Sequence, residues 1–358
     1  MRVIISAGGT GGHIYPALSI INKIKEKEPN SEFLYIGTKN RMESEIVPKL
    51  GIPYVGLNVI GLKKNLSVLK FVPLLNHAIS KSKKIIKEFN PDIVIGVGGY
   101  ITAPVIYSAK KLGYKTIIHE QNSIPGKSNT LLSRYADEVM VSLPGSMKYF
   151  KHNNVVLTGN PRSEEAYYAK KIDKKKYNLS KNKKLVLIVM GSLGSGTISN
   201  ALVGIIPKFK DKDYEIMIIT GKDNYDAFPK KHPSNVFILP YMDGMVDFLK
   251  NVDVLVTRAG ASTIAEILGA FIPSILVPSP YVANNHQFFN AKELLDSSAA
   301  LLLEEKDFNE ENLLKKIDLL LTNSVLYKEM QENTKKIGVI NSKEKIYQEI
   351  KKILKDKK

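Results

Sequence analysis

Short apolar runs alternate with amphipathic stretches along most of the chain. The first amphipathic stretch repeats apolar residues at the i, i+3, i+4, i+7 spacing of a helix that packs on a sheet, and it predicts a helix over residues 13–27. Strands that alternate with helices are typical of parallel βαβ units, so the pattern predicts an α/β fold. The strands expected in the first half cover residues 3–6, 33–36, 93–97, 116–118, 138–141 and 155–157.

The same pattern occurs a second time after a polar break. Residues 162–184 are lysine-rich and lack a sustained period, which is typical of a connection between domains. We therefore expect one domain over residues 1–162, another over 163–340, and a charged helix with a narrow apolar stripe within 341–358. The strands expected in the second half cover residues 185–190, 216–220, 236–239, 252–257, 274–277 and 300–303.

Composition narrows the class of protein. The 358 residues are 44% hydrophobic and 24% charged, which is typical of a globular protein that buries a sizeable core. The absence of cysteine excludes disulfides, thiolate zinc sites and cysteine nucleophiles, and it favours a reducing compartment. The N-terminus does not resemble a signal peptide, and no run reaches the ~18–20 apolar residues that span a bilayer. We expect a cytoplasmic protein that is not an integral membrane protein.

The net charge of +17 favours anionic partners such as nucleic acid, anionic lipid or phosphorylated ligands. Most of the surplus is lysine, which indicates codon bias and solvated lysine faces. Because no interleaved aromatic platform or RNA motif accompanies the charge, we expect no nucleic-acid partner. The few arginines are better suited to bidentate phosphate recognition than lysine is. They are Arg2, Arg41, Arg134, Arg162 and Arg258.

A glycine-rich loop, GGTGGH at residues 8–13, lies between the first strand and the first helix. Free N–H groups at a helix start hold phosphates or oxyanions, and glycines permit close approach. The loop matches neither GxGxxG nor GxxxxGK[ST], which disfavours a dehydrogenase. His13 stands at the start of this helix, where the helix dipole favours the neutral ring that a general base requires. The alternative is that His13 merely caps the helix.

Two further motifs of the first half follow predicted strands. GVGGY occupies residues 96–100 and HEQN occupies residues 119–122. The carboxyl ends of parallel strands meet at one edge of the sheet, where ligands bind in open α/β folds. Tyr100, Glu120 and Asn122 are therefore candidate polar contacts, with plain loop packing as the alternative.

The second half contains equivalent loops. GSLGSG at residues 191–196 follows a strand, and RAGASTIAEIL at residues 258–268 leads from a strand into a helix. Glu266 lies about one turn into that helix, and its carboxylate suits a ribose diol. A capping or solvent-facing glutamate is the alternative.

These motifs, together with GNPR at residues 159–162 and NNHQFFNA at residues 284–291, resemble the MurG family of bacterial N-acetylglucosaminyltransferases over essentially the whole chain. The resemblance implies the GT-B architecture, in which two Rossmann-like domains with parallel sheets face each other across a cleft. The N-terminal domain would bind the acceptor and the membrane, the C-terminal domain would bind UDP-GlcNAc, and the last helix would return to the N-terminal domain.

The implied activity is an inverting transfer of GlcNAc from UDP-GlcNAc to the 4-hydroxyl of MurNAc in lipid I, which gives lipid II. This peptidoglycan reaction would occur on the cytoplasmic face of the bacterial membrane, with the protein as a peripheral member. His13 is the expected base, and Glu120 on the same sheet edge competes for that role. No cofactor and no metal is expected, because helix N-termini and charged side chains would stabilise the leaving diphosphate.

The resemblance also assigns binding residues. Ser192 and Arg162 would contact phosphates, Ala261, Ser262 and Thr263 would hold the diphosphate and sugar hydroxyls, Glu266 would bind ribose, and Met242 would offer backbone atoms to uracil. Gln287 and Asn122 would read the GlcNAc hydroxyls, while Thr10, Gly11, Gly12 and Tyr100 would lie on the acceptor side. His286 occupies a place where other members have glutamine, and a ring nitrogen would replace the amide there.

A membrane contact is expected at residues 66–75, LSVLKFVPLL. The apolar residues are too continuous for a clean amphipathic helix, Pro73 interrupts them, and nearby lysines would attract anionic lipid. Core packing is the alternative for this stretch. A glycolipid transferase that acts on diacylglycerol is a rival function, which HEQN disfavours.

Overall fold

The computed structural model describes residues 1–59, 68–191 and 195–355, with the side chains of residues 68–71 left out. The chain forms two compact units. Unit 1 comprises Met1–Arg162 and Asn341–Lys358, and unit 2 comprises Ser163–Ile340. The polypeptide therefore passes from one unit to the other twice.

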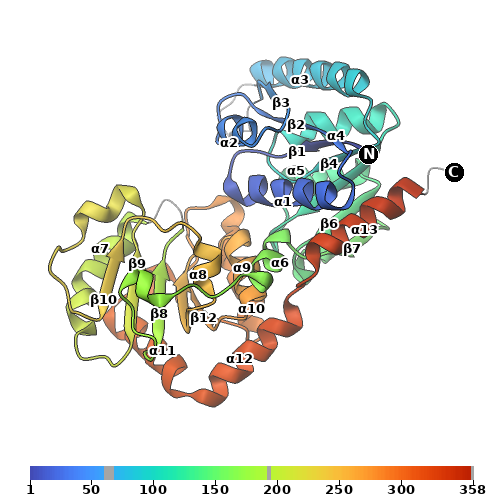
Figure 1. Cartoon of the computed structure of the whole chain (residues 1–358). Helices are drawn as coiled ribbons and strands as arrows, with labels where there is room; N and C mark the ends of the chain where they lie inside the picture. Colours follow the sequence, from blue (N-terminus) through green and yellow to red (C-terminus); the bar gives the residue numbers. More distant parts are fainter. Residues whose placement is uncertain (60–67, 192–194, 356–358) are drawn as a thin grey trace. The chain divides into compact units, whose positions relative to one another are not determined.

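Unit 1 is built on a parallel seven-stranded sheet with helices on both faces (Figure 1). Its strand order, β3-β2-β1-β4-β5-β6-β7, reverses direction between β1 and β4, as in a doubly wound fold. The strands are β1 (Arg2–Ser6), β2 (Glu32–Thr38), β3 (Tyr54–Leu57), β4 (Ile93–Gly96), β5 (Lys115–Glu120), β6 (Glu138–Val141) and β7 (Val155–Leu157). The helices are α1 (Gly11–Lys27), α2 (Glu43–Lys49), α3 (Val68–Phe89), α4 (Thr102–Lys111), α5 (Lys127–Leu132) and α13 (Ser342–Lys355), with 3₁₀ turns η1 (Ser133–Tyr135) and η2 (Pro144–Tyr149).

Unit 2 repeats the plan with a parallel six-stranded sheet of order β10-β9-β8-β11-β12-β13. Its strands are β8 (Leu185–Val189), β9 (Glu215–Ile219), β10 (Val236–Leu239), β11 (Val254–Thr257), β12 (Ser274–Leu276) and β13 (Leu301–Leu302). Its helices are α7 (Gly196–Ile205), α8 (Met245–Leu249), α9 (Ala261–Ala270), α10 (His286–Asp296), α11 (Glu310–Thr322) and α12 (Ser324–Ile337). The 3₁₀ turns are η3 (Lys174–Tyr177), η4 (Ile206–Phe209), η5 (Lys222–Ala227), η6 (Ala283–Asn285) and η7 (Glu305–Asp307), and α6 (Pro161–Tyr168) runs across the boundary between the units.

The strands are apolar because helices cover both sheet faces. In β8 the four residues from Leu185 to Ile188 are fully buried, and β4 is equally enclosed. Such continuous apolar runs are what parallel sheets require. The predicted α/β fold with two parallel sheets is confirmed.

Three local expectations were wrong. The first helix begins at Gly11 instead of His13, because Gly11 and Gly12 already have helical geometry after the N-cap Thr10. Strand β3 was not expected, since Tyr54–Leu57 contains Gly56 and only Leu57 is buried. The polar stretch after Arg162 is not a free connection, because backbone N–H groups of Lys170 and Ile172 donate to side chains of unit 2.

The expected membrane stretch lies partly outside the described residues, which resume at Val68. From there the chain is helical as α3, and Pro73 falls within this helix without ending it. Val72 and Leu74 are exposed. Among the described helices, none combines the length and the apolar character needed to cross a bilayer.

Candidate functional site

The glycine loops of unit 1 meet where the strand order reverses. The carboxyl ends of β1 and β4 are neighbours in the sheet, and the Gly8 N–H donates to the Gly98 carbonyl over 3.3 Å. Gly98 has φ +106°, and a Cβ there would lie 2.5 Å from the His13 ring. Only glycine allows the loop to pack against this imidazole. The structure therefore brings the two loops together around His13, as expected.

The His13 ring is held in one orientation. Its Nδ1 lies 3.0 Å from the Gly8 carbonyl oxygen, and since a carbonyl can only accept, Nδ1 carries the hydrogen. The neutral ring then has its lone pair on Nε2. The side chain is half-buried in the first turn of α1. This geometry suits a general base.

A buried carboxylate that the sequence analysis missed supports the same loop. Glu43 is fully buried, and it accepts hydrogen bonds from the Gly9 N–H at 3.1 Å and from the Thr38 N–H and hydroxyl at 3.1 and 2.7 Å. It thereby ties the loop after β1 to the end of β2. No sequence signal marked Glu43, because its partners lie up to 34 residues away.

Glu120 is enclosed by donors. Its side chain is 2% exposed. The two carboxylate oxygens accept five hydrogen bonds, from the backbone N–H groups of Gln121, Asn122 and Gly126 and from the side chains of Asn122 and Asn129. A carboxylate used in this way organises the loop after β5, and it leaves little room for a reacting hydroxyl. The geometry therefore favours His13 over Glu120 as the base.

His119 connects this loop to the GNPR motif. The buried ring donates from Nε2 to the Gly159 carbonyl at 3.0 Å, and its Nδ1 accepts from Gln121 at 2.8 Å. Burial lowers the pKa of His119 and so keeps the ring neutral, as both contacts require. Next to Gly159, the Arg162 guanidinium lies over the Tyr15 ring of α1 at 5.9 Å. Arg162 is thus placed beside the helix that carries His13.

The other unit 1 candidates lie on the same loops. Thr10 is the exposed N-cap of α1, and its hydroxyl makes no capping bond. Gly11 and Gly12 supply the first N–H groups of that helix, which have no partner within it. Tyr100 follows the β4 loop and is half-buried, while the Asn122 amide nitrogen donates to Glu120 at 3.1 Å. The structure thus gathers the unit 1 candidates at one sheet edge.

In unit 2 the strand order reverses between β8 and β11, and α9 begins directly after β11. Ala261, Ser262 and Thr263 form the first turn of α9, behind the N-cap Gly260. The Ser262 hydroxyl is buried and finds no hydrogen-bond partner among the described residues. Because buried polar groups are normally paired, a ligand at this helix start would satisfy it.

Arg258 holds the loop that leads into α9 in place. Its guanidinium donates to the Val277 carbonyl at 3.1 Å and to the Ser195 hydroxyl at 2.8 Å, and it contacts the Glu305 carboxylate at 2.5 Å. Neither Glu305 oxygen has a hydrogen bond of good geometry, so that contact is a charge interaction within a buried site. Arg258 thereby links the loop before α7 to the loop before α9. The sequence motif contained Arg258 but gave it no role.

The remaining donor candidates are spread over three segments of unit 2. Glu266 is a half-buried residue of α9, and Met242 is buried between β10 and α8. The Gln287 amide oxygen accepts from the Ser279 N–H at 2.9 Å, and its NH₂ group is the donor of this side chain. His286 begins α10, with Nδ1 2.8 Å from the Ala283 carbonyl. Ser192 lies outside the described residues.

Comparisons with known proteins agree with these features. Residues 3–141 match the N-terminal domain of glycosyltransferase family 28, and residues 185–350 match its C-terminal domain. A Bacillus cytotoxicus protein named UDP-N-acetylglucosamine--N-acetylmuramyl-(pentapeptide) pyrophosphoryl-undecaprenol N-acetylglucosamine transferase is 45% identical over 99% of this chain and 100% of its own. A protein of the same name from Bacillus subtilis is 42% identical over 97% and 98% of the two chains.

A solved structure gives the same result. The crystal structure of Acinetobacter baumannii MurG superposes with a TM-score of 0.80 at 26% identity, over 98% of this chain and 99% of that one. Both family models and the full-length relatives cover the two units described above. The chain therefore belongs to glycosyltransferase family 28 and, within it, to the MurG group of N-acetylglucosamine transferases.

Proposed function

We propose that this protein transfers GlcNAc from UDP-GlcNAc to the 4-hydroxyl of MurNAc in lipid I, with inversion at the anomeric carbon, and so produces lipid II for peptidoglycan. The observation that supports this most strongly is the 45% identity, over nearly the full chain, to a relative named for a transfer between these partners. The site geometry is consistent with the chemistry that such a transfer needs.

His13 is the proposed base. The acceptor hydroxyl must lose a proton as it attacks, and the Nε2 lone pair is the free acceptor of a ring whose Nδ1–H is already committed to Gly8. The first N–H groups of α1, at Gly11 and Gly12, lie beside it and suit a phosphate or hydroxyl of the acceptor. Thr10 and Tyr100 complete the proposed acceptor contacts in unit 1, whereas Asn122 is proposed to contact the GlcNAc hydroxyls.

Unit 2 is the proposed donor domain. The start of α9 at Ala261, Ser262 and Thr263 offers free N–H groups, the positive helix end and one unsatisfied hydroxyl to the diphosphate. These groups stabilise the negative charge that develops on the departing UDP. Arg162 and Ser192 are proposed as further phosphate contacts.

The other donor residues would read the nucleoside and the sugar. Glu266 would accept hydrogen bonds from the ribose hydroxyls, and Met242 would offer backbone atoms to uracil. The NH₂ group of Gln287 would donate to a GlcNAc oxygen, because its carbonyl oxygen already accepts from the Ser279 N–H. His286 would contact the same sugar through its ring.

The acceptor is a membrane lipid, so we propose that the enzyme works as a peripheral protein on the cytoplasmic, anionic face of the bacterial membrane. Helix α3 supports this proposal. Its described part exposes Val72 and Leu74 near its beginning and carries Lys81 and Lys84 further along. Exposed apolar side chains on a helix that also carries lysines favour adsorption to anionic lipid.

A direct transfer assay tests the function. Purified protein, UDP-GlcNAc and a short-chain lipid I analogue should give a disaccharide lipid, measured by mass spectrometry. UDP-glucose in place of UDP-GlcNAc, and diacylglycerol in place of lipid I, serve as specificity controls. Absence of the disaccharide lipid, or faster transfer to diacylglycerol, would contradict the proposal.

A further inference from the structure

A cavity lies in unit 2, away from the proposed donor residues. It has a volume of about 640 Å³ and is lined by residues that precede β8, β11 and β12. These are the amino-terminal ends of the strands, whereas Arg258 and the start of α9 follow the carboxyl end of β11. A volume of this size is typical of small-molecule sites. The cavity is therefore distinct from the site described above.

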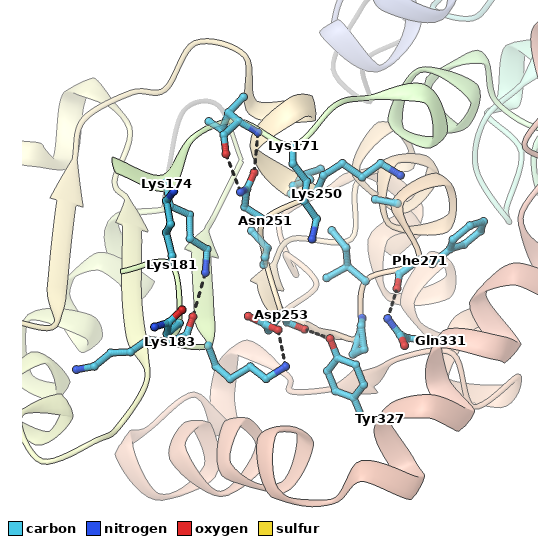
Figure 2. A pocket seen from close by; sticks show the side chains of 18 of the residues that line it. Lys171, Lys174, Lys181, Lys183, Lys250, Asn251, Asp253, Phe271, Tyr327 and Gln331 are labelled. Carbon is cyan, nitrogen blue, oxygen red and sulfur yellow. Dashed lines mark hydrogen bonds and ion pairs between the residues drawn. The ribbon is translucent and has the colours of Figure 1, made fainter. Parts of the chain in front are cut away.

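The lining of this cavity is strongly basic. Six lysines face two aspartates, Asp173 and Asp253, which leaves an excess of four positive charges. The lysines are Lys171, Lys174, Lys181, Lys183, Lys184 and Lys250. Figure 2 shows Lys174, Lys181 and Lys183 on one side of the pocket, Phe271 and Gln331 on the other, and Asp253 between them. The pocket thus has a basic wall and, opposite it, a wall without charged side chains.

Few of these lysines are neutralised. Lys184 forms an ion pair with Asp253 at 2.8 Å, and Lys174 donates to a backbone carbonyl at 3.0 Å. Within the described part of the chain, Lys171, Lys181 and Lys183 form no ion pair. Burial lowers the pKa of Lys250, so an anion placed beside it would offset a desolvation cost.

The neighbouring cavity shows that lysine-rich composition alone does not create such an imbalance. That cavity, of about 390 Å³, shares Lys183 and Lys184 with the first and adds Lys212. Three aspartates balance its three lysines, and Lys212 is paired with Asp318 at 2.7 Å. The excess of positive charge is therefore specific to the larger cavity.

The opposite wall would contact an uncharged part of a ligand. Phe271, Ile272 and Pro273 lie between α9 and β12 and line this side. Tyr327 also lines the pocket, with its hydroxyl donating to the Asp253 carbonyl at 3.1 Å. Lysines bind phosphates as point charges, and apolar walls bind rings or chains.

We propose that this cavity binds a small molecule that carries a di- or triphosphate group, with the lysine wall on the phosphates and the Phe271 wall on the remainder. The site is separate from the donor site, and it does not depend on the proposed transfer reaction. Both free polyphosphate and a nucleotide carry such a phosphate group. The two ligands differ because only a nucleotide has a further part that would contact the Phe271 wall.

Calorimetric titration distinguishes these cases. Tripolyphosphate and ATP are titrated separately into the full-length protein at fixed ionic strength, with saturating UDP present to occupy a donor site. The pocket variant is Lys171→Gln with Lys183→Gln, two exposed lysines. The matched control, Lys230→Gln with Lys231→Gln, removes the same charge from exposed lysines that line neither cavity.

We expect the pocket variant to weaken binding of both probes by about tenfold or more, since each lysine lost removes a charged contact. The control should change affinity by less than about twofold, as screened surface charges do. ATP should bind more tightly than tripolyphosphate. Equal losses in the two variants, or no binding to the wild type, would overturn the site, and equal affinity for the two probes would overturn the role of the Phe271 wall.

Discussion

The proposed reaction depends on a single side chain, the imidazole of His13. His13→Ala should reduce turnover by about 10²–10⁴-fold, because a general base contributes that much to the chemical step. Affinity for UDP-GlcNAc should remain within about twofold, since His13 is proposed to act on the acceptor hydroxyl and most of the proposed donor residues belong to unit 2. Steady-state kinetics with a lipid I analogue and calorimetry with UDP-GlcNAc measure the two quantities.

The Glu120→Gln variant, compared with His13→Ala, tests which of the two side chains is the base. Its amide nitrogen would face donors that now bind the carboxylate, so this variant should lose stability as well as activity. It should still keep more turnover than His13→Ala, because the proposed base remains in place. A His13→Ala enzyme with near-normal turnover would assign the base to Glu120 or to solvent.

Glu266 tests the proposed ribose contact. Charged hydrogen bonds contribute about 1.5–3 kcal/mol, so Glu266→Ala should weaken donor binding by roughly one to two powers of ten. Wild type should prefer UDP-GlcNAc over its 2'-deoxyuridine analogue, and the variant should lose most of that preference. Competition binding with both nucleotides measures this preference. If wild type and the variant prefer UDP-GlcNAc over the deoxy analogue to the same extent, Glu266 is a structural helix residue.

At the scale of elements, the period of apolar residues predicted most strands and the last helix because buried faces repeat regularly. Strand β3 escaped notice, since three of its four residues are only half-buried. Residues 162–184 looked like a connection between domains because several of their contacts are made by backbone groups, as where Ile172 exchanges hydrogen bonds with the Asn251 side chain. The loops around His13 were recognisable from glycine spacing, whereas Glu43 depends on tertiary contacts that no local pattern encodes.

Two carboxyl groups meet where α13 packs on unit 1. Glu138 of β6 is buried, and its proximity to Glu349 of α13 raises its pKa to about 7, with burial as the larger cause. Since this pKa lies above the unfolded value, protonated Glu138 contributes stability that is fully present below about pH 4.5 and is lost as the pH rises through about 7.

Glu138→Gln should therefore raise the melting temperature relative to wild type at pH 8 and reduce or reverse that difference at pH 5. A change of ~1 kcal/mol corresponds to ~2–4 °C for a protein of this size. Differential scanning calorimetry at both pH values measures the difference. An identical offset at pH 5 and pH 8 would show that the pair does not titrate between them.

Helix α3 carries the proposed membrane contact. Val72→Asp with Leu74→Asp should reduce co-sedimentation with anionic liposomes, because both side chains are exposed and an aspartate resists transfer into the interface. Leu319→Asp with Val325→Asp is the matched control, since these residues are at least as exposed but belong to unit 2. After circular dichroism confirms folding, equal binding by all three proteins would exclude α3 as the contact.

At the scale of the whole molecule, unit 1 is assembled from both ends of the chain. Helix α13 lies beside α1 (Figure 1) and buries Ile346, Ile350 and Ile353 in the core of unit 1. Lys351 pairs with Glu28 at 2.7 Å, and the Ser342 hydroxyl donates to the Asn160 carbonyl at 2.8 Å. Three buried isoleucines contribute roughly 5–9 kcal/mol by area, which is comparable to the whole stability of a domain.

A protein ending at residue 340 should therefore have a stable unit 2 and a unit 1 that is readily cleaved by protease. Ile350→Ala should weaken unit 1 by about 2–5 kcal/mol, and Gln348→Ala, on the exposed face of α13, should have little effect. Limited proteolysis followed by mass spectrometry identifies which unit is cut. Equal resistance of the two units in the truncated protein would show that α13 is dispensable.

Because the chain passes between the units twice, the order of synthesis determines when unit 1 can complete its fold. The ribosome makes residues 1–162 first, but the segment that completes their core emerges only after all of unit 2. At ~5–20 residues per second this delay is roughly 10–40 s. During this time the surface of α1 that packs against α13 has no partner. The domain that is translated first is thus the last to be finished, and the apolar side chains that α13 covers have no cover from it throughout that interval.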